Sequence, residues 1–200
     1  MSRRWTRRSA LAAAFVVGVA LAAVQSGSAY AHDSSGSGTN DVQRSTNGYD
    51  WATVRDLLTV WSGTWQYNDI NVALADGYVP GPVDEGICVQ GPEGVRGYHY
   101  TNWERLLAPT LDFSKPPMLV YQPDGHGGMK LVAVEFYHTD ADQDLSTNDD
   151  LPYFGSYPFK GPMEGHVPGM PIHYDTFVWA WQYNPAGLTA DFNPLGSCEE

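Results

Sequence analysis

The sequence predicts an α+β fold in which N-terminal helices pack on one face of an antiparallel sheet of four to six strands. Apolar residues recur every three or four positions between Tyr49 and Gly77, which indicates helix. Alternating apolar runs bounded by Gly and Pro follow from Gly97 onward, which indicates strands. No internal repeat or second apolar core is present, so one domain is expected. A small β-barrel with a flanking helix is the alternative fold.

Residues 1–31 have the pattern of a secretory signal peptide. Four arginines precede an apolar stretch from Ala10 to Val24, and residues 29–31 match an A-x-A cleavage site. The apolar stretch is short for a membrane span. The predicted organisation is a signal peptide over 1–31, a disordered Ser/Gly-rich tail over 32–48 and a single globular domain over 49–200. The protein is therefore predicted to be secreted or extracytoplasmic.

The acidic composition limits the classes of partner. The chain has 11 basic and 23 acidic residues, which gives a net charge of −12. Loss of the four signal-peptide arginines leaves seven scattered basic residues and a net charge of −16. Without a basic patch, nucleic acid and anionic membranes are poor partners, so a small-molecule ligand or a metal ion is expected. No membrane span is expected after signal cleavage.

The two cysteines, Cys88 and Cys198, predict a disulfide bond. An isolated pair in an exported protein is typical of a structural bridge, here one that ties the C-terminus to an earlier segment. Closing a loop of this size stabilises a fold by about 4–5 kcal/mol in the chain-entropy model. The chain has no CxxC motif, which argues against a redox or zinc role for the sulfurs.

The helical section runs from Tyr49 to Gly77. We expect its apolar stripe to pack on the sheet, with Gly63 dividing it into two helices and Gly77 ending it in the left-handed conformation. The stripe consists of Trp51, Val54, Leu58, Trp61 and Trp65, followed by Ile70, Ala73 and Leu74.

Three shorter strands are expected before the last one. They cover Gly97–Tyr100, Met118–Tyr121 and Met129–His138, and the Gly-rich turn Asp124–Gly128 makes the latter two a hairpin. The other expected elements are a helical turn in Asn102–Ala108, a packed loop or lid in Tyr153–Pro171 and a short helix in Ala186–Phe192.

The strongest strand pattern starts at His173 and continues to Tyr183. Both of its faces are largely apolar, so a central strand covered on both sides is predicted. Pro171 and Asn184-Pro185 limit it at its two ends. One predicted face carries His173, Asp175, Phe177, Trp179, Trp181 and Tyr183.

Glu135 is a carboxylate inside a strand that is apolar on both sides. Its predicted face also holds Met129, Leu131, Ala133 and Tyr137. Burial of an unpaired charge is costly, so a cation, a hydrogen-bond donor or a metal should lie beside it. An edge position, or a structural salt bridge with one of the arginines Arg96 and Arg105, is the competing interpretation.

These polar positions support three hypotheses about function. In the first, His99, Glu135, His166 and His173 bind zinc, iron or copper, with Asp175 orienting an imidazole. In the second, the aromatic residues form a non-catalytic binding module for a small apolar or cationic ligand. In the third, His173 and Asp175 act as a metal-free acid–base pair. We expect His99, Glu135 and His173 to converge on one pocket; structural roles for every histidine are the alternative.

The acidic loop DADQDLSTNDD, residues 140–150, is a candidate calcium site. Asp140, Asp142 and Asp144 repeat the first three ligand positions of an EF-hand loop. The pattern then fails, because it lacks the Gly at the sixth position and has Leu151 at the twelfth. A solvated acidic loop is the competing interpretation.

Three segments, GYHY, DADQDLSTNDD and HYDTFVWAWQYNPAG, resemble those of a group of exported bacterial proteins that are uncharacterised. The resemblance covers the chain from about Trp65 onward and implies a family but no activity. The usual hydrolase, zinc-protease, phosphate-loop and dinucleotide signatures are absent from the sequence.

Overall fold

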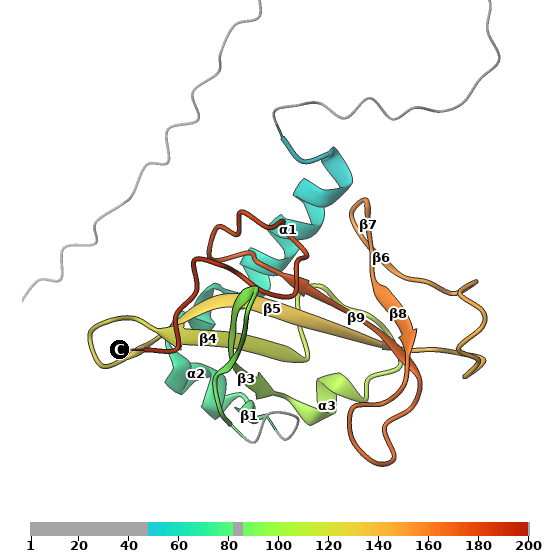
Figure 1. Cartoon of the computed structure of the whole chain (residues 1–200), viewed down its shortest axis with the longest axis horizontal. Helices are drawn as coiled ribbons and strands as arrows, with labels where there is room; N and C mark the ends of the chain where they lie inside the picture. The colour runs from blue at the N-terminus through green and yellow to red at the C-terminus, as the bar shows by residue number, and fades with distance from the viewer. Residues whose placement is uncertain (1–47, 82–85, 200) are drawn as a thin grey trace, which may run out of the picture. The chain divides into compact units, whose positions relative to one another are not determined.

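A computed structural model describes residues 48–81 and 86–199 of the chain. The signal peptide predicted over 1–31 and nearly all of the tail predicted over 32–48 lie outside these residues. The described part is the α+β fold that the sequence predicts, with an open sheet (Figure 1). No helix within residues 48–81 and 86–199 is long and apolar enough to cross a lipid bilayer.

Three consecutive helical segments begin the described part. They are α1 (Trp51–Thr64), the 3₁₀ helix η1 (Trp65–Asn68) and α2 (Ile70–Ala75). The Asp50 carboxylate accepts a hydrogen bond from the Thr53 backbone N–H at 3.1 Å and caps α1. The predicted division falls after Thr64 rather than at Gly63, whose Cα lies so close to Ser114 that a Cβ would stand 2.0 Å from the Ser114 carbonyl oxygen. Gly77 ends the section at φ +86°, as predicted.

The predicted apolar stripe of α1 is wrong. Of its members, Trp51, Leu58, Trp61 and Trp65 are all exposed, with 78% of Trp51 accessible. The buried face of α1 is made of Thr53, Asp56, Leu57, Val60 and Thr64. Polar groups are tolerated there because Asp56 accepts a hydrogen bond at 2.9 Å from the backbone of Gly155, on a loop that covers the helix.

Seven strands form one antiparallel sheet in the order β1-β3-β4-β5-β9-β8, with β2 also paired to β3. The terminal strands β1 and β8 are not paired with each other, so the barrel alternative is wrong. The strands are β1 (Val79–Pro80), β2 (Val89–Gly91), β3 (Gly94–Thr101), β4 (Met118–Pro123), β5 (Met129–Thr139), β8 (Lys160–Met163) and β9 (His173–Val178). The short helix α3 (Trp103–Leu106) and the hairpin β6 (Tyr153–Phe154) and β7 (Tyr157–Pro158) complete the elements.

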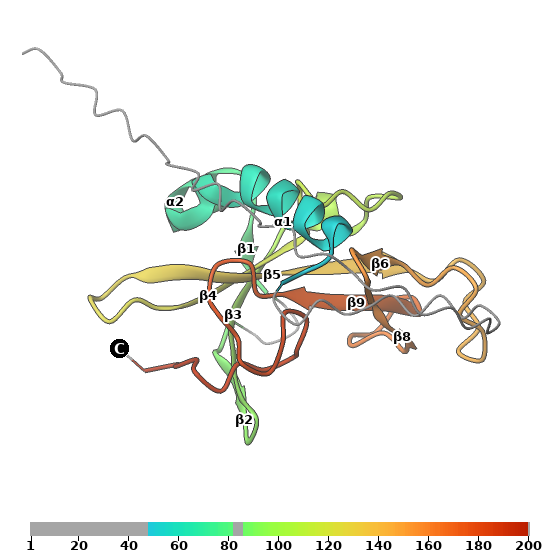
Figure 2. The ribbon, with the colours of Figure 1, turned by 90° about the horizontal axis from the view of Figure 1, so that it is seen from above.

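The main core lies between the helices and one face of the sheet, and Figure 2 shows α1 and α2 along this face. Leu119, Val134, Phe136 and Tyr174 contribute from the central strands. Residues alternate between faces along a strand, so Met118, Glu135 and His173 point to the opposite face. That second face carries the candidate site.

A bulge in β5 changes which of its residues share a face. In β5, Val120 pairs with Ala133 but Tyr121 pairs with Leu131, so Val132 is an extra residue. Leu131 and Met129 consequently pack in the main core, and the prediction that they share the face of Glu135 is wrong.

The strand predicted over His173–Tyr183 is shorter in the structure. Strand β9 ends at Val178, and Trp179 donates its backbone N–H to Leu188 instead of continuing the ladder. Trp181 does not share the face of Trp179, because its indole N–H donates to Thr64 of α1 at 3.0 Å. The predicted helix over Ala186–Phe192 is also wrong, and this segment forms turns.

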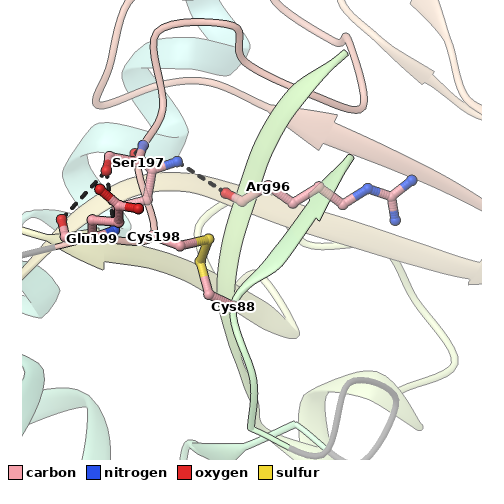
Figure 3. The surroundings of a disulfide bond; sticks show 6 residues. Cys88, Arg96, Ser197, Cys198 and Glu199 are labelled. Atoms are coloured by element: carbon pink, nitrogen blue, oxygen red, sulfur yellow. Dashed lines mark hydrogen bonds between the residues drawn. A yellow bond between two sulfur atoms is a disulfide. The ribbon is translucent and has the colours of Figure 1, made fainter. Parts of the chain in front are cut away.

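The predicted disulfide joins Cys88 to Cys198 across 110 residues, with 5.8 Å between the Cα atoms. It fastens the C-terminal segment beside β3, where Val95 and Asn193 also exchange backbone hydrogen bonds. Figure 3 shows the Arg96 side chain extending away from the disulfide.

Candidate metal centre

A cavity of about 220 Å³ lies on the sheet face opposite the helices. Strands β3, β4, β5 and β9 supply its floor, and the β8–β9 loop supplies one wall. The four residues predicted as metal ligands all line it, together with the Asp175 carboxylate. Its full lining is Val89, Arg96, His99, Met118, Glu135, Tyr137, His166, Met170, His173 and Asp175.

Three of these side chains form a compact group of metal-ligand type. One ring nitrogen each from His166 and His173 and one carboxylate oxygen from Asp175 lie within 4.8 Å of one another. His173 and Asp175 are two residues apart on β9, so they share a face. His166 belongs to the loop between β8 and β9, which brings its ring to 5.0 Å from that of His173.

His173 is held in one orientation by its surroundings. The side chain is buried, and its ring stacks on that of Tyr137 at 4.8 Å. Its Nδ1 atom lies 3.1 Å from the Pro171 carbonyl oxygen, which can only accept, so Nδ1 carries the proton. The Nε2 atom then carries a lone pair that can bind a metal, and this atom is buried without a hydrogen-bond partner among the described residues. Burial also lowers the pKa of His173, which favours the neutral, ligating form.

Asp175 is the carboxylate of this group. Its Oδ2 atom is 3.8 Å from His166 Nε2. Burial raises the pKa of Asp175, while His166 acts in the opposite direction. The prediction that Asp175 works through His173 therefore differs from the geometry, in which the nearer imidazole partner of this carboxylate is His166.

His99 and Glu135 form a second polar pair in the same cavity. His99 Nε2 lies 3.5 Å from Glu135 Oε2, and both side chains are largely buried. Burial raises the pKa of Glu135 to about 7, although His99 and Arg96 lower it. Glu135 stands on the central strand β5, so the alternative of an edge position is wrong.

Arg96 also lines the cavity, although the sequence predicted only a structural role for it, as a partner for Glu135. Alternation along β3 would place it on the face opposite His99, but Val89 pairs with Gly97 and Gln90 with Val95, which makes Arg96 the extra residue of a bulge. One signal in the sequence could have revealed this, since the next residue is Gly97, and a glycine inside a strand pattern is typical of a bulge.

A second cavity of about 240 Å³ adjoins the first and shares Met118, Tyr137 and Met170 with it. It is largely apolar, and it lies between α3 and the β8–β9 loop, which Figure 1 shows side by side. Trp103, Leu106 and Pro168 contribute to its lining. Sequence reasoning did not predict this compartment, because it forms between a short helix and an irregular loop.

The acidic loop does not bring the three candidate calcium ligands together. Asp140 and Asp142 both accept hydrogen bonds from the Asp144 backbone N–H, at 3.0 and 2.9 Å. Asp144 in turn accepts from the Ser146 backbone N–H at 2.9 Å. Within the described residues these carboxylates cap the turns of their own loop and do not form a close ligand group.

Comparisons of the chain with protein-family models, with curated proteins and with solved structures found no match. The resemblance to exported bacterial proteins therefore stays a prediction from sequence. A functional assignment has to come from the chemistry of the cavity itself.

Proposed function

We propose that the domain binds a divalent transition metal through His166, His173 and Asp175 and uses it in hydrolysis of a small molecule. The observation that carries this proposal is the buried His173 Nε2, which has no hydrogen-bond partner among the described residues. A buried polar atom without a partner costs about 1–3 kcal/mol, and a metal ion bound between the three side chains would remove that cost. Two imidazoles and one carboxylate suit zinc, with iron or copper as the competing ions.

The neighbouring groups support a reaction rather than mere metal storage. A zinc ion with three protein ligands keeps a position for water and supplies a Lewis acid that lowers the pKa of that water. Glu135 faces the same cavity, and its pKa of about 7 suits a carboxyl group that exchanges a proton near neutral pH. His99, at 3.5 Å from Glu135, can hold that carboxyl group in place.

A non-catalytic binding module is the second candidate function, and one observation favours it. A cavity of about 300 Å³ on the α1 side of the domain is rich in aromatic residues, and the described residues of its lining include no charged side chain. The aromatic residues are Tyr49, Trp61, Trp179, Trp181 and Tyr183. Such a lining suits an apolar or cationic ligand. The metal-free pair of His173 and Asp175 has less support, because His173 Nε2 makes no hydrogen bond in the described part.

Metal titration of the chelator-treated protein tests the first proposal. We expect one tightly bound zinc or cobalt ion per chain by calorimetry, and visible absorption bands of four-coordinate cobalt. The variants H166N and D175N should each weaken binding more than the roughly 10–100-fold typical of losing a ligand's hydrogen-bond partner. His166 is exposed, so H166N should leave the fold intact.

The matched control is H126N, which removes an exposed histidine from the β4–β5 turn. All variants keep the rest of the chain, so a metal bound away from the cavity would contribute equally to each. Unchanged metal affinity in both H166N and D175N would contradict the proposal.

We also propose that the protein is exported from the cytoplasm, because a disulfide bond is typical of proteins in oxidising compartments.

A further inference from the structure

The guanidinium group of Arg96 is fixed at the wall of the metal cavity by two aromatic rings. Its central carbon lies 5.0 Å from the centre of the Phe177 ring and 4.8 Å from that of Phe192. The bulge at Gly97 directs the side chain to this position on the face of His99. A phenylalanine ring has no conventional hydrogen-bond acceptor, so the N–H donors of the guanidinium group are left for other partners.

Those donors have few partners within residues 48–81 and 86–199. The Nε atom is buried and has no hydrogen-bond partner among the described residues. The ion-pair contact of an Nη atom with Asp191 Oδ1 is 3.9 Å long, which exceeds hydrogen-bonding distance. That same Asp191 oxygen accepts a direct hydrogen bond from Lys160. Arg96 therefore lines the cavity with terminal N–H groups that have no close acceptor in the described part.

We propose that the cavity takes a small organic carboxylate, bound by the terminal N–H groups of Arg96 beside the metal triad. This inference rests on the proposed function, because the carboxylate identifies the substrate class of the same site. A planar carboxylate matches the fork of donors that a guanidinium presents in its own plane. A divalent ion on Asp175 would also offset the negative charge of that side chain, which would otherwise repel an anion.

The contacts of Arg96 differ from those expected of an arginine with a purely structural role. A structural arginine in a mostly buried position normally has its donors paired with carboxylates or carbonyl oxygens at hydrogen-bonding distance. Here the closest carboxylate among the described residues, Asp191, already pairs with Lys160, and Glu135 and Asp175 interact with Arg96 only at longer range. The guanidinium stays partly accessible at the cavity, with 31% of its side chain exposed. The two aromatic contacts hold the Arg96 side chain in place, which reduces the entropy lost when a ligand binds.

Calorimetric titration with benzoate tests the inference, with neutral benzamide as the matched ligand and inorganic phosphate as a third arm. Each ligand is added to the metal-free and to the zinc-loaded full chain. We expect benzoate to bind, benzamide to bind at least about tenfold more weakly, and R96Q to weaken benzoate binding about tenfold or more, which is the effect of losing hydrogen bonds to a charged group. R96K should give a smaller loss, because lysine keeps the charge but not the planar fork.

The matched control K130Q removes an exposed positive charge on β5 and should bind benzoate like the wild type. Equal affinity of benzoate and benzamide, tighter binding of phosphate than of benzoate, or wild-type benzoate affinity in folded R96Q would overturn the inference. Zinc titration of the same samples separates the two proposals. If zinc binds but benzoate binding does not depend on Arg96, the proposed carboxylate ligand is rejected and the proposed metal site stands. If benzoate binding depends on Arg96 but zinc does not bind, the proposed metal site is rejected and the carboxylate ligand stands.

Discussion

His99 and Glu135 meet across an intervening strand, with 3.5 Å between His99 Nε2 and Glu135 Oε2. Strand β4 lies between their strands β3 and β5, and in its ladders His99 is opposite Val120 while Glu135 is opposite Met118. The two side chains therefore reach toward each other diagonally over β4. The order of the strands therefore places the Glu135 carboxyl group in a buried position. This burial should make the free energy of unfolding depend on pH.

We predict that E135Q stabilises the metal-free protein at alkaline pH. The folded state raises the pKa of Glu135 from 4.5 to about 7, so it holds this proton more tightly than the unfolded chain does. The free energy of unfolding should therefore decrease as pH rises from about 4.5 to about 7. Glutamine resembles the protonated form and cannot ionise, so the variant should gain on the order of a few kcal/mol at pH 8. Urea unfolding in the presence of a chelator measures this.

The control for E135Q is E104Q, at an exposed position of α3. It should follow the wild-type pH dependence within error, because an exposed carboxyl group has little differential solvation. An E135Q protein that is less stable than the wild type at pH 8 would contradict the prediction. It would mean that the ionised carboxylate makes interactions in the fold that outweigh its burial.

The sequence predicted the residues of the cavity better than it predicted how they work. Apolar alternation placed Glu135 and His173 on central strands, and a buried polar group needs partners, so convergence on one pocket followed. The assignment of Asp175 to His173 missed the loop residue His166 as its nearer partner, because the path of an irregular loop is not encoded in a local period. Arg96 was missed for a related reason, since a bulge reverses the alternation on which the prediction depends.

We predict that G97A disrupts the bulge that presents Arg96. Gly97 has φ +124°, and an added Cβ would stand 2.4 Å from the backbone oxygen of Tyr121 on β4. Strain and steric overlap should together lower the free energy of unfolding by more than about 1–3 kcal/mol. The matched control is G187A, which has φ +131° but no atom within 4 Å of the added Cβ. Denaturant unfolding of both variants separates the backbone strain, which both variants share, from the steric overlap, which only G97A has.

The overlap with Tyr121 should make G97A clearly less stable than G187A. In any G97A protein that folds, benzoate affinity should also fall, because the position of Arg96 depends on the bulge. Equal losses of stability in the two variants would show that the close approach of β3 and β4 at Gly97 is relieved at no cost.

We predict that the double variant C88S/C198S folds with reduced stability. The bridge closes a loop across 110 residues, which corresponds to about 4–5 kcal/mol in the chain-entropy model. The C-terminal segment should keep its backbone pairing at Val95 and Asn193, so the native structure should survive the loss. Thermal unfolding of the variant and of the reduced wild type should agree. A loss well below 1 kcal/mol would contradict the chain-entropy estimate for this loop.

The helical region and the last strand illustrate a second limit of sequence reasoning. The spacing of Trp51, Leu58 and Trp65 is typical of a buried stripe, yet these residues face solvent. The buried face contains Asp56 and Thr53 because both are satisfied by the loop around Gly155, about a hundred residues away in the chain. Long-range polar partners of this kind leave no local periodic signal. The end of β9 at Val178 has a similar cause, since Trp181 turns toward Thr64 of α1.

We predict that H173N loses the metal while keeping the local structure. The Nδ2 group of asparagine occupies nearly the place of the imidazole Nδ1, so it can still donate to the Pro171 carbonyl oxygen. It has no counterpart of Nε2, the buried atom that we propose as a ligand. Zinc at a free concentration 100 times its Kd should stabilise the wild type by about 2.7 kcal/mol, because only the folded state binds it. The same zinc concentration should leave H173N almost unchanged.

The measurement for H173N is thermal unfolding with zinc and with chelator, alongside the wild type and H126N. A control for the stability of H173N is its unfolding in chelator, where the lost stacking on Tyr137 should lower the melting temperature in a zinc-independent way. If H173N is stabilised by zinc as much as the wild type, the ion binds elsewhere in the chain. The unpaired Nε2 would then be a polar atom that the fold leaves unsatisfied, and the proposed metal centre would be rejected.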